Sequence, residues 1–598
     1  MKKNIFNKMI VLTIVILFIF LSAIPSVNSN AISKPNSNNN AEFEIYSKTI
    51  NFSSPKLEES KDSITIIVDE ASKYTQSTGK PMLPYTTYVL TFPLGTNIET
   101  IDISYSDPEL IILDKPVKLA PPLNWYNFKN LPNDNLITST NKNFQIPFCS
   151  YQLGGGIENG EHVTFLSFQI FPVNYDSINL VIKYINQIDI NIKYKKSQPI
   201  FLEDTYSLVI ISSSNFLSPL QKLADHKAEN GLTTKLVSLD QIYNGEYFPA
   251  EGYDEAEKIK YFIKNSVEQW GTDYILLIGS IYNLPMRIAL FGDMKLLTDM
   301  YYADLYFEDG SFCDWDSNGN HIYGEYWHND EKDIVDLYAD VYLGRIPCNN
   351  IIDVNIAVNK IIKYESQPHD DWWDKIILLG GDTFPGWGVY EGEVTNNCIA
   401  EALPDFNHVK LWTSKGTFTP EKINEEVNKG ARFLEYSGHG YEFGMGTSPP
   451  NDQNRINYYT RNLLSLHNSH KLPVVFFDAC LTAKLDYVFG DLLGLYGFLN
   501  IPLPVYAWYW VKKIGGGAIA TIGATEVAFS YVDSNGPNGG AGYLSLHFFE
   551  GYSSCKTVSE MLVYSQNDYL NNLWKDHWTI EQFTLLGDPT LKVGGISE

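Results

Sequence analysis

Two stretches of the sequence decide the predicted fold: ARFLEYSGHG at residues 431–440 and LPVVFFDAC at residues 472–480. Each begins with a short, mostly apolar run, which is typical of a strand buried in a parallel sheet. The first run leads into His439 between two glycines, and the second leads into Cys480. Because ligands bind beyond the carboxyl ends of parallel strands, neighbouring strands would bring both residues to one edge.

Apolar strands alternate with amphipathic helices on both sides of these stretches. We expect an α/β fold with mainly parallel sheets, because such alternation places helices over both faces of a sheet. A break in the pattern near residues 369–373 divides the region into two α/β subdomains, 201–370 and 371–598. The further predicted strands are 206–212, 234–238, 274–279, 375–380, 409–412 and 517–522.

Residues 61–200 have a different pattern, with short apolar runs separated by Pro, Gly, Asn and Asp. No segment there has a convincing helical period, so we predict an all-β domain, a sandwich being the natural arrangement. Residues 30–60 are rich in Asn, Ser and Lys and are expected to form a flexible leader.

The N-terminus combines two lysines, an apolar run over residues 10–24 and a small residue at Ser29. This pattern predicts a signal peptide over residues 1–29 and therefore a secreted protein. An uncleaved membrane anchor is the alternative, although the apolar run is shorter than the roughly 20 residues that a spanning helix needs. No later segment is apolar enough to span a bilayer, so no stable membrane span is expected after cleavage.

The composition excludes several classes of protein. With 44 Lys+Arg against 70 Asp+Glu, the net charge of −26 argues against nucleic acid as a partner. The six cysteines are irregularly spaced without a CxxC pair, which argues against a disulfide scaffold or a cysteine zinc site. A hydrophobic fraction of 44% provides enough apolar surface for large cores.

His439 and Cys480 together suggest nucleophilic catalysis. Cysteine attacks as a thiolate, and a nearby imidazole can lower the thiol pKa or protonate a leaving amine. The glycines beside His439 allow the backbone to approach a substrate closely. The N–H groups near Gly440 and Cys480 could then hold an oxyanion. Taken alone, each of these residues is more often structural.

Several motifs resemble the gingipain family of caspase-like cysteine peptidases. They are YSGHG at 436–440, LPVVFFDACLTAKLD at 472–486, GGGAIATIGAT at 515–525 and LLGDPTLKV at 585–593. Two further stretches, 276–287 and 336–347, also match, and residues 79–84 and 92–95 resemble the N-terminal prodomain of the family. The resemblance implies a caspase/gingipain-like catalytic region of two α/β subdomains, preceded by an all-β prodomain.

The resemblance also implies roles for individual residues. His439 would be the general acid and Cys480 the nucleophile of a cysteine endopeptidase that cleaves proteins or peptides. Asp382 would orient the histidine, and Glu393, with Glu391 as a competitor, would line the S1 pocket and favour a basic P1 residue. Solvated loop carboxylates are the alternative for these acidic residues. A sortase-like transpeptidase on the same fold and a non-catalytic surface or scaffold protein are the competing functions.

A separate motif at residues 314–325 has the spacing D-x-D-x-N-G-x5-E. Oxygen ligands at alternate positions, a glycine at the turn and a final glutamate are typical of a calcium loop. The flanks do not resemble EF-hand helices, so we expect a structural Ca2+ site between strands, with a metal-free Asx-rich turn as the alternative. The ligands would be Asp314, Asp316, Asn318, Asn320 and Glu325.

The β-rich domain before the catalytic region suggests that the protein is made as a latent zymogen. Lys195 and Lys196 at the junction form a candidate processing site for an enzyme that prefers basic P1 residues. An uncut accessory domain joined by a basic linker is the alternative.

Overall fold

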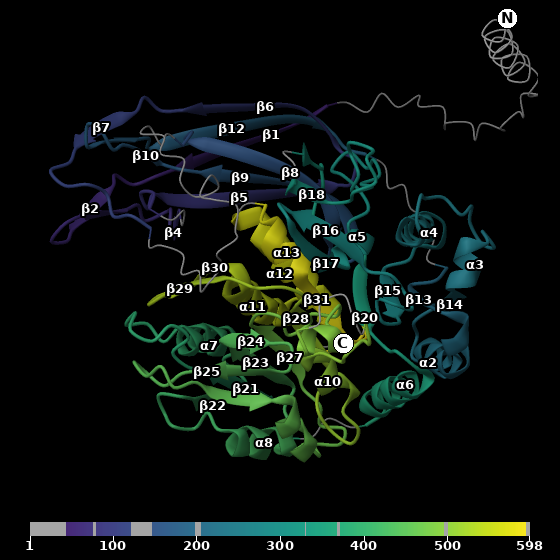
Figure 1. Cartoon of the computed structure of the whole chain (residues 1–598). Coiled ribbons are helices and arrows are strands. Elements are labelled where there is room, and N and C mark those ends of the chain that lie inside the picture. Colours follow the sequence, from purple (N-terminus) through teal and green to yellow (C-terminus); the bar gives the residue numbers. More distant parts are fainter. Residues whose placement is uncertain are drawn as a thin grey trace, which may run out of the picture. The chain divides into compact units, whose positions relative to one another are not determined.

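The computed structural model describes residues 43–75, 79–120, 146–197, 205–328, 331–367, 371–494, 500–573 and 575–593 (Figure 1). The residues from Glu44 onward form one compact unit. The predicted signal peptide, residues 1–29, lies outside the described residues. None of the helices among the described residues combines the length and apolar character that crossing a membrane requires.

One ten-stranded sheet runs through the α/β region. Its strands are short and almost completely buried, in agreement with the continuous apolar runs of the sequence. In spatial order they are β14 (Thr234–Ser238), β13 (Leu208–Ser212), β15 (Tyr274–Ile278), β20 (Tyr342–Ile346), β31 (Phe583–Leu586), β28 (Ala520–Ala524), β27 (Val474–Asp478), β23 (Phe433–Ser437), β21 (Lys375–Gly380) and β22 (Asn407–Trp412).

The sheet consists of two parallel sets joined by a single antiparallel pair. Strands β14, β13, β15, β20 and β31 run parallel to one another, as do β28, β27, β23, β21 and β22. Strand β31 pairs antiparallel with β28, so the two sets point in opposite directions. The carboxyl ends of β23 and β27 therefore lie at the opposite edge from those of β13 and β15.

The prediction of an α/β region with mainly parallel sheets after an all-β region is confirmed. The two expected subdomains share one sheet, because the last strand of the sequence, β31, completes the first parallel set. In Figure 1, helices α7 and α11 lie on one side of β21, β23 and β27, and α8 lies on the other.

Helix ends follow the signals in the sequence. Asp254 caps α4 by accepting from the N–H of Glu257, and Gly271, at a φ of 67°, ends that helix. The predicted cap Thr419 begins α8, which has proline in its first turn. The main helices are α2 (Leu217–Glu229), α4 (Glu255–Trp270), α6 (Ile351–Glu365), α7 (Glu391–Ala402), α8 (Pro420–Lys429), α10 (Tyr506–Lys512), α11 (Gly540–Glu550), α12 (Val558–Asn572) and α13 (His577–Gln582).

Shorter elements complete the α/β region. They are α3 (Leu239–Tyr243), α5 (Met300–Ala303), α9 (Phe489–Leu492), β16 (Arg287–Phe291), β17 (Met294–Thr298), β18 (Glu325–His328), β19 (Glu331–Lys332), β24 (His439–Tyr441), β25 (Gly444–Thr447), β26 (Ile456–Tyr459), β29 (Ser530–Asp533) and β30 (Gly536–Gly539).

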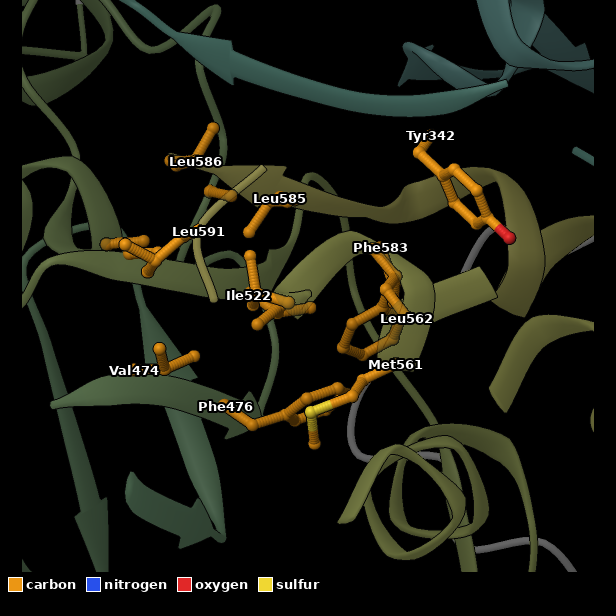
Figure 2. Close-up of a cluster of buried hydrophobic side chains, with 14 of the residues drawn as sticks. Tyr342, Val474, Phe476, Ile522, Met561, Leu562, Phe583, Leu585, Leu586 and Leu591 are labelled. Carbon is orange, nitrogen blue, oxygen red and sulfur yellow. The ribbon is translucent and has the colours of Figure 1, made fainter. Parts of the chain in front are cut away.

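The antiparallel junction lies over a dense apolar core, shown in Figure 2. Phe476 on β27 and Phe583 at the start of β31 stack with ring centroids 5.7 Å apart. Ile522 on β28 and Met561 on α12 are completely buried in the same cluster. Each such side chain contributes about 1.5–3 kcal/mol by leaving water, so this core holds the two parallel sets together.

The N-terminal β-domain has several small sheets around its own core. Its strands are β1 (Glu44–Asn51), β2 (Lys56–Glu59), β3 (Ile64–Ile67), β4 (Lys73–Tyr74), β5 (Pro84–Pro93), β6 (Asn97–Tyr105), β7 (Glu109–Ile112), β8 (Cys149–Glu158), β9 (Glu161–Ile170), β10 (Val173–Asp176), β11 (Val181–Tyr184) and β12 (Gln187–Lys195).

The prediction of a flexible leader over residues 30–60 is wrong for the second half of that segment. Residues 44–51 form β1, which pairs with β12 along its whole length. Tyr46 and Ile50 pack against the β-domain core, and Glu44 forms an ion pair with Lys196. The polar composition hid this strand because β1 is largely exposed, with few apolar contacts to mark it.

Strands β8 and β9 of the β-domain pack tightly against the α/β region. The stacked rings of Phe165 and Tyr338 have centroids 5.0 Å apart, and Phe165 and Ile157 belong to the same apolar cluster as the large sheet. The N–H of Gly155 donates to the buried carboxylate of Asp336 at 2.5 Å, and the N–H of Ile157 donates to Ala339 at 2.7 Å. The β-domain therefore shares a continuous interior with the α/β region.

We predict that Gly155→Ala destabilises this packing. A Cβ at Gly155 would lie 2.6 Å from the carbonyl oxygen of Phe307, closer than backbone atoms allow. Overpacking of this kind costs about 1–3 kcal/mol. The midpoint of thermal unfolding should fall by several degrees, whereas Ser150→Ala on the same strand should leave it unchanged. Equal midpoints for the two variants would contradict the tight packing of β8.

Candidate active site

Strands β23 and β27 are neighbours in register, so the residues that follow them lie at the same edge. Ser437 is opposite Asp478, and the Ser437 hydroxyl donates to the Asp478 carboxylate at 2.6 Å. The N–H of Gly438 also donates to the carbonyl of Asp478, at 3.1 Å. His439 and Cys480 each come two residues after this pair.

Gly440 lies directly against Cys480. A Cβ on Gly440 would be 2.1 Å from the carbonyl oxygen of Cys480 and 2.9 Å from its nitrogen. Only glycine can occupy this position without moving the backbone. Leu481, just after the cysteine, has a φ of 57°, which turns the chain sharply out of the strand direction. The segment carrying His439 is thus pressed onto the turn carrying Cys480.

The His439 ring is held from one side by a backbone carbonyl. Its Nε2 lies 2.9 Å from the carbonyl oxygen of Thr383, and the ring of Phe384 packs edge-on with centroids 5.5 Å apart. Because a carbonyl can only accept, Nε2 must carry the hydrogen. The neutral ring therefore keeps the lone pair of Nδ1 for accepting another proton.

The surroundings keep both reactive groups neutral at pH 7. Burial lowers the pKa of His439 to about 4, the positive charge of Arg455 acts in the same direction, and the Thr383 carbonyl opposes them. Burial raises the pKa of the Cys480 thiol to about 11, against weaker hydrogen bonds that include the N–H of Gly440. The thiol itself donates to the carbonyl of Ala528 at 3.3 Å. The resting pair is a thiol and an imidazole.

The hydrogen bond from the N–H of Gly440 to the Cys480 sulfur is consistent with the expected oxyanion site. An N–H that points at the cysteine sulfur also points toward the space where an attacked carbonyl would sit. The N–H of Cys480 makes a hydrogen bond of the same kind to its own sulfur.

Asp382 does not hold the histidine, contrary to our expectation. Its main chain pairs with Ser448, and its carboxylate accepts from the N–H of Asn451 at 2.9 Å. The side chain is 1% exposed, and burial raises its pKa. The carbonyl of the next residue, Thr383, takes the place beside His439, because the Asp382–Ser448 bridge turns the aspartate toward Asn451.

Glu391 and Glu393 begin helix α7 and contact different partners. The Glu393 carboxylate accepts from the N–H of Ser414 at 2.9 Å and from its hydroxyl at 2.6 Å. The Glu391 carboxylate instead accepts from the N–H groups of Thr383 and Phe384, at 3.0 and 3.4 Å. Burial raises the pKa of Glu391 to about 6, so it is mostly ionised at pH 7.

No residue type marks the Thr383 carbonyl as a partner of His439, because every residue has a backbone carbonyl. Glu391 could be noticed only as a rival of Glu393, since both are acidic and stand at the start of the same helix. Two residues apart on a helix, they point in different directions. Their hydrogen-bond partners, and not their spacing in the sequence, distinguish Glu391 from Glu393.

The loop expected to bind calcium forms a compact turn with Gly319 at a φ of 72°. The carboxylate of Asp316 accepts from the N–H of Asn320 at 2.9 Å. The side-chain amides of Asn318 and Asn320 both donate to one oxygen of Glu325, at 3.0 and 2.7 Å. The carboxylate of Asp314 accepts from the N–H of Asp316 at 3.1 Å.

Among the described residues, no three His, Cys, Asp or Glu side chains gather closely enough to hold a metal ion. Rotating the amides of Asn318 and Asn320 by half a turn would direct their oxygens at Glu325 instead of their nitrogens. Three oxygens facing one another would repel unless a cation lay between them. The donor set therefore fits calcium only after this rearrangement.

A family model described as "Peptidase family C25" matches residues 202–594. The chain belongs to this family. Gingipain R1 from Porphyromonas gingivalis is 23% identical over 364 residues, which cover 55% of this chain and 32% of the relative. Gingipain R2 from the same organism is 23% identical over 344 residues, 56% of this chain and 39% of the relative. The chain thus covers about a third of the length of these relatives.

Solved structures of the family give partial superpositions. A complex of the pro- and mature domains of RgpB from Porphyromonas gingivalis has a TM-score of 0.46 and 21% identity, covering 64% of this chain and 79% of that one. A crystal structure of the Arg-specific cysteine proteinase gingipain R has a TM-score of 0.46 and 20% identity, covering 66% of this chain and 80% of that one.

The neutral state of this C25 pair predicts how Cys480 reacts with iodoacetamide. Because the thiolate is the nucleophile and the thiol pKa is raised to about 11, the rate should increase about tenfold per pH unit between pH 7 and 10. Mass spectrometry of the Cys480 peptide measures it, with Cys480→Ala as the control for the other cysteines. A rate that is already maximal and flat at pH 7 would show an ion pair instead.

Proposed function

We propose that the protein is a cysteine endopeptidase in which Cys480 is the nucleophile and His439 transfers the proton. One observation carries this proposal: β23 and β27 are in register, and Gly440 lies directly against Cys480. Two residue types suited to nucleophilic catalysis therefore follow adjacent strands at one sheet edge. Membership of peptidase family C25 supports the same chemistry.

The reaction follows from the resting state of the pair. Nδ1 of the neutral His439 takes the thiol proton as the sulfur attacks the peptide carbonyl, since the Nε2 hydrogen already donates to Thr383. The imidazolium then gives that proton to the leaving amine as the C–N bond breaks, which leaves a thioester on Cys480. Water then attacks the thioester carbonyl, and the C–S bond breaks. The hydroxyl of the water leaves with the acid product, and its other proton returns to the Cys480 sulfur, which restores the thiol.

A preference for basic P1 residues is the finer part of the proposal. Glu393 is buried, with 6% of its surface exposed, and its hydrogen bonds come from neutral donors. A carboxylate without a cationic partner among these contacts can receive an arginine or lysine side chain.

Peptide amides with Arg, Lys, Asn, Asp or Leu at P1 test both parts of the proposal. We expect Arg or Lys to be preferred, and Cys480→Ala and His439→Ala to lower kcat/KM by more than about a thousandfold. Glu393→Gln should raise KM for basic substrates about 10- to 100-fold, the worth of a charged hydrogen bond, and leave Leu substrates unchanged.

The outcomes separate the alternatives. Turnover that survives Cys480→Ala would refute the cysteine mechanism. Products joined to an added amine, in place of free acids, would identify a transpeptidase. No turnover with any substrate, even after cleavage near Lys196, would favour a scaffold role.

Export and latency complete the proposal. The basic and apolar N-terminus supports secretion, as expected from the sequence. The β-domain supports latency, because its strand β8 shares an interior with the α/β region and both reactive groups are neutral in this arrangement. Cleavage after Lys196 would cut the chain at the end of β12 without by itself separating the two parts.

Calcium binding to the loop is a further proposal, resting on the spacing of Asp314, Asp316, Asn318, Asn320 and Glu325. Calcium at 100 times its dissociation constant should stabilise the fold by about 2.7 kcal/mol, seen as a higher midpoint of thermal unfolding that a chelator reverses. Glu325→Gln should abolish the shift, and Asp309→Asn, outside the motif, should retain it. Equal midpoints with calcium and with chelator would identify a metal-free turn.

A further inference from the structure

One peptide group connects a buried carboxylate to the ring of His439. The N–H of Phe384 and the carbonyl of Thr383 belong to the same peptide bond. That N–H donates to the Glu391 carboxylate at 3.4 Å, and the carbonyl accepts from Nε2 of His439 at 2.9 Å. The same carboxylate oxygen also accepts from the N–H of Thr383 at 3.0 Å. A negative charge on one side of the peptide thus faces a ring N–H on the other.

Hydrogen bonds in such a chain strengthen one another. A carboxylate that accepts from the peptide N–H draws the amide dipole toward itself and increases the negative charge on the carbonyl oxygen. That oxygen then holds the imidazole N–H more strongly and favours the ring when it becomes positive during proton transfer. Burial of Glu391, at 8% exposure, protects this effect from screening by solvent.

The other acidic side chains nearby have different sets of partners. The Asp382 carboxylate, whose charge also acts on Glu391, accepts from the N–H of Asn451 at 2.9 Å and from the N–H of Phe384. Glu393 accepts from Ser414. Arg455 is the charged group that acts on the His439 ring, and it opposes protonation. Of these carboxylates, Glu391 is the one that accepts from the N–H groups of both Thr383 and Phe384.

We propose that Glu391 is a positioning residue that orients and polarises His439 through the Thr383–Phe384 peptide. This inference rests on the proposed peptidase function for its kinetic consequences, although the hydrogen-bond chain itself does not. Glu391 touches neither substrate nor sulfur. Its effect should therefore appear in proton transfer and not in substrate binding.

The kinetic test uses Glu391→Gln, which keeps the shape and one acceptor oxygen but removes the charge. We expect kcat to fall about 10- to 100-fold, part of what an oriented general base contributes, with KM nearly unchanged. Glu401→Gln is the matched control, since it removes a charge from the last turn of the same helix, away from this peptide, and kcat should stay within about twofold. Glu391→Asp, which restores the charge, should recover part of the loss.

The second readout is independent of activity. In the Cys480→Ala background, 15N NMR of His439 reports which ring nitrogen carries the hydrogen. We expect the Nε2-protonated tautomer to predominate, and Glu391→Gln to shift the Nε2 resonance and reduce that tautomer, whereas Glu401→Gln leaves both unchanged. A thermal midpoint and circular dichroism spectrum equal to the parent establish that each variant is folded.

The outcomes distinguish this inference from the proposed function. Unchanged His439 resonances in a folded Glu391→Gln variant would overturn the positioning role, whatever the activity. A parent protein without peptidase activity but with resonances that respond to Glu391→Gln would refute the proposed function and retain the hydrogen-bond chain. A fall in kcat equal for Glu391→Gln and Glu401→Gln would also overturn the inference, since it would show a general effect of charge.

Discussion

The register between β23 and β27 is the constraint on which the candidate site depends. It places Ser437 opposite Asp478, and their side-chain hydrogen bond ties the ends of the two strands together just before His439 and Cys480. Burial raises the pKa of Asp478 to about 7, and the bond from Ser437 acts against that rise. A shift of one residue would turn alternate side chains to the other face and separate the reactive pair.

The strands that carry the candidate site are fixed by a packed core, whereas the segments after the strand ends form the site itself. The apolar core formed by β27, β28, β31 and α12 holds these strands in place (Figure 2). Beyond the strand ends, Gly440 closes onto Cys480, and the Thr383–Phe384 peptide closes onto the His439 ring. The β-domain contributes through the same continuous interior, since Ile157 and Phe165 belong to the large apolar cluster. The proposed latency rests on this shared core and on the neutral state of both reactive groups.

Sequence reasoning reached the features that depend on local pattern. Continuous apolar runs located the buried strands, and glycines on both sides of His439 indicated a close backbone approach, because each signal lies within a few residues. The antiparallel placement of β31 was missed, since it depends on pairing with β28, about sixty residues away in the chain. The contact of Thr383 with His439 was missed because it uses a backbone atom. The resemblance to gingipains assigned Asp382 to that contact, as the acidic residue after an earlier strand. Asp382 precedes Thr383 in the sequence, but its carboxylate accepts from the N–H of Asn451.

The central claim is that Cys480 and His439 work as one unit at the edge where β27 and β23 end. A peptidyl acyloxymethyl ketone tests it most directly, because this inhibitor class alkylates a cysteine only after binding as a substrate does. Mass spectrometry should locate a single adduct on Cys480 of the folded protein, and His439→Ala should suppress it while leaving the fold intact. Equal labelling without His439, or an adduct on another cysteine such as Cys398, would contradict the account.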